Sequence, residues 1–415
     1  MAAGGKLQAP RGTFDVLPED GRRRARLRAI CDELFEPAGY GPVDTPILEA
    51  TELFARGVGE TTDIVQKEMF TFDDQGGRSV TLRPEGTAAV CRAYVEHGMH
   101  KQPQPVKLWY WGAFFRHEAP QAGRYRQFNQ VGVEAIGSDD PSLDAEVILL
   151  LSELLTRAGA KGVRLRLGSL GTPETRREYS NELREHLRSR EAELSDEVRA
   201  RLDANPLRAF DSDHPGTKAV VKDAPKLLDS LNEEDAAHFA EVRALLDEAG
   251  RDYEIDDALV RGLDYYTRTV FEFTSDALGA QSGVGGGGRY DGLIEQLGGP
   301  HTPGVGWAAG IERILMVSEL EASGAKLDVY VVRDGAGAVT EFKALGALRE
   351  AGFNAQMEQA GRSVKGQFKQ ADRLGARSVL IVGADALSVR DMKTGDQTEV
   401  PDLAEALAAL QEVLA

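Results

Sequence analysis

Apolar positions recur with two different periods in the first 170 residues, which predicts both helices and strands. Residues 25–36 have helical spacing, with Leu27, Ile30 and Leu34 on one face. Residues 41–49 resemble a strand whose prolines confine it to a sheet edge or an interface. The same reasoning predicts strands at 69–72, 79–83, 107–114 and 131–136, and helices at 86–97 and 144–158.

The segment 172–257 differs from its surroundings, because it is dense in Glu and Arg and has few strand-like runs. A strand pattern resumes at 270–273, followed by a glycine run at 283–288. We therefore interpret 172–257 as a helical module inserted into the earlier pattern. The apolar residues 307–317 recur with a helical period, which predicts a helix.

A shift in composition near 323–325 separates the last part of the chain from the rest. Beyond it, strands are predicted at 327–332, 353–357 and 378–382, and helices at 339–351 and 364–374. Such alternation predicts a small α/β domain with a mixed or parallel sheet. We expect the 415 residues to form domains at 1–325 and 326–415.

Composition indicates a cytoplasmic protein. The hydrophobic content of 42% and the charged content of 28% are ordinary for a globular chain. Cys31 and Cys91 lie far apart, which supports neither a disulfide framework nor a cysteine zinc site and favours a reducing compartment. Neither a secretory signal nor an apolar run of about 20 residues is evident, so no membrane association is expected.

The net charge of −18 opposes RNA binding at first sight, but it does not show where positive charge gathers. Residues 107–128 contain four Lys or Arg and one Glu. An acidic protein with such basic patches would bind RNA through a defined, salt-dependent footprint. Composition alone leaves this point open.

Residues 115–128, Phe-Arg-His-Glu followed by a basic loop and Arg-Gln-Phe, join two predicted strands as a hairpin. The fork of Arg116 suits bidentate binding of a phosphate, and Phe128 offers a flat face for a base. These features suggest a nucleotide held on an antiparallel sheet. The order of residues closely resembles motif 2 of class II aminoacyl-tRNA synthetases.

A second group of residues lies at 261–266, Arg-Gly-Leu-Asp-Tyr-Tyr, and a third at 286–291, Gly-Gly-Gly-Arg-Tyr-Asp. In isolation the first would be a loop with a salt bridge and two core tyrosines. Together they resemble the two histidine-specific motifs of histidyl-tRNA synthetases. The glycine run also fits a dinucleotide fingerprint, but antiparallel surroundings favour a glycine floor on which a substrate lies against the backbone.

Further motifs occur in the order that this family shows. Residues 304–313 resemble motif 3, residues 11–18 the N-terminal signature, and 361–377 the anticodon-binding domain, while Pro46 matches the interface proline of motif 1. Thr87 could cap the following helix, or Glu85 and Thr87 could bind an α-ammonium group, which the resemblance favours. His97 and His100 lack a nearby third ligand, so no metal site is predicted.

The resemblance implies an α+β class II catalytic domain, an antiparallel sheet flanked by helices with a helical insertion, and a C-terminal α/β anticodon-binding domain. It implies that ATP activates L-histidine to histidyl-adenylate and that histidine then passes to the 3′ end of histidine tRNA. ATP is a substrate, and Mg²⁺ is expected with its phosphates. The implied partners are histidine tRNA, at its acceptor end and anticodon, and a second copy in a homodimer.

The resemblance also assigns the site residues. Arg261 and Arg116 are the implied catalytic residues. Histidine is expected to contact Glu85, Thr87, Gln130, Glu134, Arg261, Tyr265, Tyr266 and Tyr290. ATP is expected to contact Arg116, Glu118, Tyr125, Phe128 and Arg313, and tRNA Gln121, Arg124, Arg126, Lys365 and Lys369.

Two other interpretations are considered. One is a non-catalytic histidine-binding protein that resembles the synthetase-like regulatory subunit of ATP phosphoribosyltransferase. The other is an RNA-binding or stress-sensing module with a degenerate synthetase fold. Both would be expected to lose ATP ligands, whereas this chain keeps Arg116, Arg261 and Arg313 together.

Overall fold

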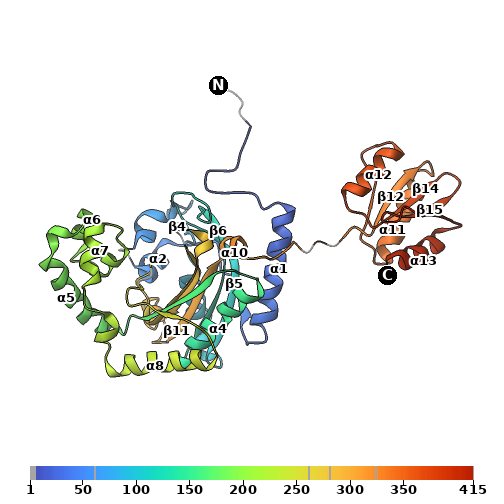
Figure 1. Cartoon of the computed structure of the whole chain (residues 1–415). Coiled ribbons are helices and arrows are strands. Elements are labelled where there is room, and N and C mark those ends of the chain that lie inside the picture. The colour runs from blue at the N-terminus through green and yellow to red at the C-terminus, as the bar shows by residue number, and fades with distance from the viewer. Residues whose placement is uncertain are drawn as a thin grey trace. The chain divides into compact units, whose positions relative to one another are not determined.

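The structure, a computed structural model, describes residues 6–59, 62–259, 262–279, 282–322, 324 and 326–414, apart from the side chains of 208, 211 and 414. The chain divides into two compact units, Met1–Ala322 and Ser323–Ala415 (Figure 1). None of the helices formed by the described residues has the length and apolar character needed to cross a membrane.

Unit 1 is built on an eight-stranded sheet in the order β1-β5-β6-β11-β10-β9-β7-β8. The outermost pairs, β1–β5 and β7–β8, are parallel and all the others are antiparallel. The strands are β1 (Gly41–Pro42), β5 (Val106–Phe115), β6 (Gln127–Ile136), β7 (Val163–Ser169), β8 (Glu254–Ile255), β9 (Thr267–Ser275), β10 (Gly283–Arg289) and β11 (Gly304–Gly310). The predicted hairpin is confirmed as β5 and β6, which pair over their whole length.

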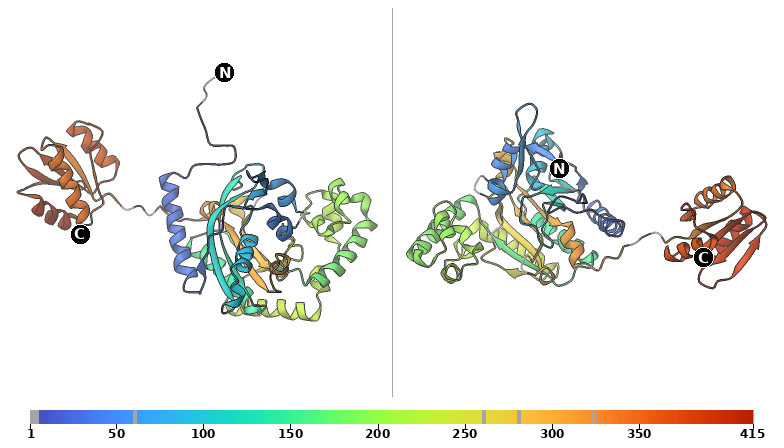
Figure 2. Two further views of the ribbon diagram at one scale, coloured as in Figure 1. Left: turned by 180° about the vertical axis from the view of Figure 1, so that it is seen from behind. Right: turned by 90° about the horizontal axis from the view of Figure 1, so that it is seen from above.

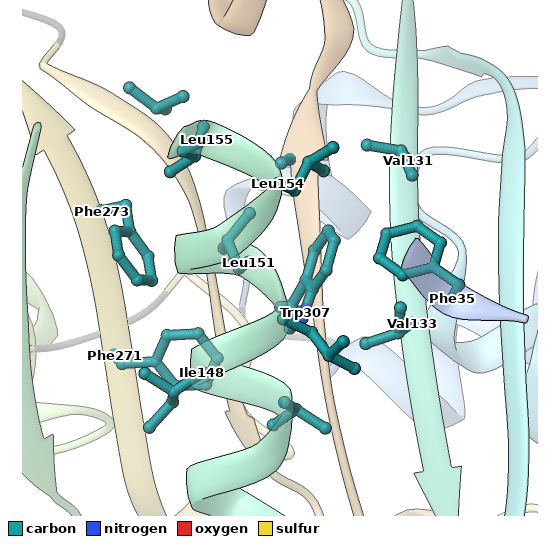
Figure 3. Packing of buried hydrophobic residues seen from close by; sticks show 14 of the residues in the cluster. Phe35, Val131, Val133, Ile148, Leu151, Leu154, Leu155, Phe271, Phe273 and Trp307 are labelled. Carbon is teal, nitrogen blue, oxygen red and sulfur yellow. The ribbon is translucent and has the colours of Figure 1, made fainter. Parts of the chain in front are cut away.

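One face of this sheet packs against helices to form the largest core. These helices are α1 (Pro18–Phe35), α4 (Pro141–Arg157), α8 (Glu233–Glu248) and α10 (Ile311–Val317). Leu151 and Leu154 of α4 point toward Trp307 of β11 and Phe273 of β9 (Figure 3). Because side chains alternate along a strand, burial of these positions directs their neighbours to the opposite face of the sheet.

The opposite face is covered by α3 (Thr87–Glu96) and the short α9 (Leu293–Gln296), which share a second core with it. A three-stranded sheet in the order β2-β4-β3, with β2 (Leu48–Ala50), β3 (Phe70–Asp73) and β4 (Ser79–Leu82), leads into α3. Helix α2 (Thr51–Val58) and the π-helical turn η1 (Ile64–Glu68) complete this region. The predicted strands around the turn at 74–77 are thus confirmed.

Helices occupy the chain between β7 and β8: α5 (Pro173–Ser189), α6 (Asp196–Arg201), α7 (Pro215–Lys222) and α8, with 3₁₀ turns between them. Helices α5–α7 gather at the end of unit 1 away from α1, and α8 returns to lie beside α4 (Figure 1, Figure 2). We call residues 172–248 the helical module.

Two predicted elements are wrong in part. Residues 41–49 form two short strands at the edges of two different sheets, because Pro42 and Pro46 prevent a continuous ladder. Residues 307–310 belong to β11, and the helix begins only at Ile311. A central strand buried on both faces carries apolar residues at every position, so a short run resembles a helix.

Unit 2 has a five-stranded sheet in the order β13-β12-β14-β15-β16. Its strands are β12 (Val329–Asp334), β13 (Ala355–Met357), β14 (Ser378–Gly383), β15 (Leu387–Asp391) and β16 (Gln397–Val400), and its helices are α11 (Ala338–Glu350), α12 (Val364–Arg373) and α13 (Leu403–Leu414). The first three strands in this order pair in parallel and the last two join antiparallel, so of the predicted mixed or parallel sheet the mixed form is observed. The sequence reasoning did not identify β15, β16 and α13.

Candidate active site

A pocket of about 240 Å³ lies over the middle of the large sheet, at the ends of the β5–β6 hairpin and the start of α10. Its wall contains three arginines, Arg116, Arg124 and Arg313. The remaining lining residues are Glu118, Gly123, Tyr125, Phe128, Gln130, Glu272, Gly283, Val284, Gly285, Ala308, Gly310 and Glu312. All five residues predicted to contact ATP, Arg116, Glu118, Tyr125, Phe128 and Arg313, are therefore among its lining residues.

Arg116 follows directly after β5 and is held by the backbone of another segment. Its Nε donates to Pro84 O at 2.9 Å, and its guanidinium lies 5.4 Å from the ring centre of Phe128. Its Nη1 is 4.0 Å from Glu118 Oε1, and Glu118 also forms an ion pair with Arg124. The arginine and the aromatic face predicted to bind phosphate and base are therefore adjacent.

Arg313, in the first turn of α10, connects the loop of the β5–β6 hairpin to strand β10. Its Nε donates to Gly123 O at 2.9 Å and its Nη1 to Gly283 O. Burial lowers the pKa of Arg313, and the nearby Arg124 lowers it further. Clustered cations of this kind favour a polyanion such as a triphosphate, which relieves their mutual repulsion.

A second, closed part of the site is centred on Glu134 of β6, which is fully buried. Thr87 Oγ1 donates to Glu134 Oε1 at 2.7 Å, and Tyr290 Oη donates to Oε2 at 2.6 Å. Burial raises the pKa of Glu134 to about 8, although both hydrogen bonds oppose the rise. A Cβ at Gly306 would overlap Glu134 Oε2, so β11 needs a glycine there.

The sequence suggested that Thr87 could cap helix α3, but Glu85 has this role. Its Oε2 accepts from Thr87 N at 2.8 Å and its Oε1 from Ala88 N at 2.9 Å, so Glu85 caps α3. Thr87 instead directs its hydroxyl to Glu134. Burial raises the pKa of Glu85, while these hydrogen bonds and Arg116 counteract it.

Three tyrosines enclose this closed part. Tyr265 and Tyr266 precede β9, Tyr290 follows β10, and all three are buried. The ring centre of Tyr265 lies 4.7 Å from that of Tyr266 and 5.9 Å from that of Tyr290. Tyr265 Oη also donates to Glu85 Oε2 at 3.5 Å. The structure thus brings residues from three distant motifs together around two carboxyl groups.

The other predicted residues lie in three places. Gln130 lines the pocket, while Gln121 and Arg124 form an isolated bridge in the hairpin loop. Arg126 N donates to Gly12 O at 2.8 Å. Lys365 and Lys369 are exposed on one face of α12 in unit 2. Arg261 lies outside the described residues.

Some residues of the site were not identified from the sequence. Glu272 and Glu312 line the pocket, and Glu312 accepts from Asn129 Nδ2 at 2.9 Å and Arg24 Nη2 at 2.6 Å. Tyr110 is buried opposite Gly132, and burial together with Glu134 and Glu85 raises its pKa well above the usual value. Strand alternation placed Tyr110 and Glu134 on one face, but no motif distinguished Tyr110.

Arg289, within the third sequence motif, is structural. It is fully buried and forms a bidentate ion pair with Asp144 of α4, with Nε 2.9 Å and Nη2 2.5 Å from Oδ2. The described residues contain no group of three or more His, Cys, Asp or Glu that could hold a metal ion. His97 is the C-cap of α3, and His100 lies in the 3₁₀ turn that follows.

Comparison with known families places this geometry in context. The family model described as histidyl-tRNA synthetase matches residues 12–314, and that described as anticodon binding domain matches 329–413. A histidine–tRNA ligase from Halothermothrix orenii is 46% identical over 420 residues, covering 98% of this chain and all of the relative. One from Rubrobacter xylanophilus is 47% identical, covering 94% of this chain and 96% of the relative.

Solved structures agree. The apo histidyl-tRNA synthetase of S. aureus superposes with a TM-score of 0.81 at 38% identity, covering 98% of this chain and all of that one. A Bacillus halodurans protein described as an ATP phosphoribosyltransferase regulatory subunit/histidyl-tRNA synthetase has a TM-score of 0.67 at 23% identity, covering 91% and 99%, and shares the fold. The predicted class II catalytic and anticodon-binding folds are confirmed, and the chain belongs to the histidyl-tRNA synthetase family.

Proposed function

We propose that this chain is an ATP-dependent histidine–tRNA ligase, which activates L-histidine to histidyl-adenylate and transfers histidine to the 3′ end of histidine tRNA. The observation that carries the proposal is that two different sites lie next to each other. A cationic pocket with Arg116 and Arg313 adjoins a closed site around Glu134, and Gln130 lies on the same strand as Glu134.

Adenylation is an in-line attack of the histidine carboxylate on the α-phosphorus of ATP, with pyrophosphate leaving. Negative charge develops on the α-phosphate, so cations held in place supply much of the stabilisation. Arg116 would bind the α-phosphate and Arg313 the distal phosphates. Arg261 would approach the α-phosphate from the opposite side, as the family resemblance implies. The carbonyls that hold Arg116 and Arg313 keep both cations oriented before ATP arrives.

The closed site would recognise histidine through its two ring nitrogens. Glu134 would hold one nitrogen and Tyr266 the other, with Tyr265 and Tyr290 closing the site. Glu85, Thr87 and Gln130 would bind the α-ammonium group. A carboxylate has about four acceptor positions, so Glu85 can cap α3 and still accept from an ammonium.

Phe128 would stack on adenine, with Glu118 and Tyr125 beside the base. Mg²⁺ would accompany the phosphates as part of the nucleotide substrate. Glu272 lines the same pocket, and its carboxylate is a type of ligand that Mg²⁺ accepts. Mg²⁺ bound to nucleotide needs only one or two protein carboxylates, so this residue fits the requirement.

Two surfaces would contact tRNA. Gln121, Arg124 and Arg126 in the hairpin loop would meet the acceptor end, and Lys365 and Lys369 on α12 the anticodon. We also propose that the helical module grips the acceptor arm. In support, a groove of about 450 Å³ along α5 is lined by three arginines, Arg176, Arg177 and Arg184.

We further propose the division into a catalytic domain at 1–325, with an insertion near 172–257, and an anticodon-binding domain at 326–415. A cytoplasmic homodimer is proposed on family grounds. Pro46 lies next to Ile47 and Leu48, which are 46% and 49% exposed and supply apolar surface for a second copy.

The experiment that tests the function is amino-acid-dependent exchange between ATP and pyrophosphate across all twenty amino acids, without tRNA. We expect exchange with histidine alone. Histidine binding without exchange would instead support a regulatory, non-catalytic protein, and exchange with another amino acid would refute the assigned specificity.

A further inference from the structure

The tyrosines of the closed site lie on a segment that no strand ladder supports. Residues 262–266 contain a bend and a turn at Asp264 and Tyr265 but no strand, and β9 begins only at Thr267. Yet Tyr265 and Tyr266 are both only 5% exposed, so the surrounding residues restrict the positions of their rings. Buried backbone groups outside regular structure must find other partners, and these partners determine where the rings lie.

One partner is Arg176, on the helical module. Its Nη1 donates to Tyr266 O at 2.8 Å and lies 3.4 Å from Asp264 O, which its Nη2 also approaches at 3.4 Å. The planar fork of an arginine thus spans the two carbonyls on either side of Tyr265. Burial lowers the pKa of Arg176, while Asp264 counteracts this.

A second connection follows at Arg268. This residue has a φ of +45°, a left-handed conformation that is unfavourable for a non-glycine residue and persists where its surroundings hold it. Its Nε donates to Asp235 Oδ1 at 3.0 Å, and its Nη2 pairs with Glu234. Asp235, buried in α8, also accepts from Thr172 N at 2.8 Å.

The other side of the segment rests on the end of α2. Asp264 N donates to Val58 O at 3.1 Å. Gly59, with a φ of +106°, leaves the room that Asp264 fills, because a Cβ there would lie 2.6 Å from Asp264 Oδ2. The segment therefore lies between α2 and α5, with one arginine of the module fixing its carbonyls.

We propose that Arg176 is a positioning residue for histidine binding, through which the helical module sets the place of Tyr265 and Tyr266. The inference rests on the proposed function, because it assumes that these tyrosines contact histidine. It makes the module part of the amino-acid site, in addition to its proposed contact with tRNA. Arg176 itself touches backbone carbonyls, so its effect on histidine is transmitted through Asp264–Tyr266.

The test is histidine-dependent exchange between ATP and pyrophosphate in the full-length protein without tRNA. For Arg176→Gln we expect the KM for histidine to rise about tenfold, because hydrogen bonds from a charged donor are lost. The KM for ATP should stay within about twofold, because Arg116 and Arg313 are held by other carbonyls. The conservative Arg176→Lys should give an intermediate KM for histidine, since an ammonium cannot span both carbonyls as a planar fork.

Arg188→Gln is the matched control. Arg188 lies on the same helix α5, is exposed, pairs with Asp203 and is not among the residues that line the groove. We expect it to leave both KM values in exchange unchanged. Arg268→Gln, which breaks the second connection, should raise the KM for histidine by a smaller factor.

The outcomes separate the two proposals. A folded Arg176→Gln with an unchanged KM for histidine, or with KM values for histidine and ATP that rise equally, would overturn the positioning role. If that variant does not fold, Arg176→Lys decides by the same comparison of KM values. Absence of histidine-dependent exchange in the unmodified protein would instead refute the proposed function.

Discussion

Two regions of the active site have opposite electrostatic character. One is the pocket that contains Arg116 and Arg313, and the other is the closed site around Glu134. The pocket gathers cations, of which Arg124 is 41% exposed, and holds two of them with backbone carbonyls. The closed site buries an acid completely and satisfies both oxygens with hydroxyl groups. Oriented cations suit stabilisation of a charged transition state, whereas a desolvated polar group suits discrimination between substrates. We therefore expect mutations in the two sites to change rate and specificity separately.

The largest effect that would break this comparison is expected at Glu134. Glu134→Gln should lower kcat/KM for histidine about 10³-fold, because a buried site built on paired polar contacts penalises a mismatch strongly. Steady-state exchange at varied histidine and ATP measures it. Thr87→Ser, which keeps the hydroxyl, is the control. A Glu134→Gln variant that lowers the rate but keeps the affinity for histidine would remove the assignment of specificity to this site.

The cationic pocket should behave in the opposite manner. Arg116→Ala should lower the rate of adenylation about 10²-fold, with histidine affinity nearly intact, as for a contact made in the transition state. Arg261→Ala, at a residue whose role rests on the family resemblance, should have the same effect. Single-turnover formation of histidyl-adenylate, together with equilibrium binding of histidine, tests this. Arg78→Ala, in the exposed turn between β3 and β4, serves as the control. Normal turnover with weak histidine binding would contradict the role of either arginine.

Both sites lie in unit 1, whereas the proposed contacts to the anticodon lie in unit 2. Removing residues 326–415 should lower aminoacylation of tRNA about 10²-fold, because a second binding surface is lost, and leave exchange within about threefold. The two assays on one truncated protein give the comparison. Intact charging of tRNA would show that unit 2 does not have the proposed role.

The smallest predicted effect is the change in folding stability with pH that is due to Glu134. An unfolded Glu releases its proton near pH 4.5, whereas the folded protein keeps it until about pH 8, so the folded state binds more protons between these values. The contribution of Glu134 to stability should therefore fall as pH rises from about 4.5 to 8. Glu134→Gln cannot titrate, so its unfolding temperature should fall by a few degrees less over this range. Equal pH dependence in both proteins would contradict the raised pKa of Glu134.

Much of the fold was accessible from the sequence pattern, because short apolar runs marked most strands of unit 1 and most helices have an apolar face. The hairpin at 106–136 and the turn at 74–77 were predicted from such signals. Residues 307–310 were assigned to a helix, since a central strand buried on both faces has no alternation. In unit 2, β15 and β16 were missed because their sequences, Leu-Ser-Val-Arg-Asp and Gln-Thr-Glu-Val, contain few apolar residues.

The sequence identified many of the residues that form the site but not the contacts between them. Motifs indicated Glu85, Thr87 and Glu134, yet the hydrogen bond from Thr87 to Glu134 joins residues 47 positions apart. Nothing in the local sequence indicated that Glu85 caps α3 or that Gly306 makes room for Glu134. Such facts depend on the register of β6 against β11, which pairs Gly306 with Glu134.

By itself, the sequence determined the residue types that the chemistry requires, the family and most elements, because these depend on local pattern and on motifs of adjacent residues. The tertiary structure alone decided which groups are buried and which partners they have. Burial raised the pKa of Glu134, and Arg176 reached the carbonyl of Tyr266 across 90 positions of chain. Both effects act through space in a low-dielectric interior, where solvent exclusion and close contact depend on how distant segments pack together.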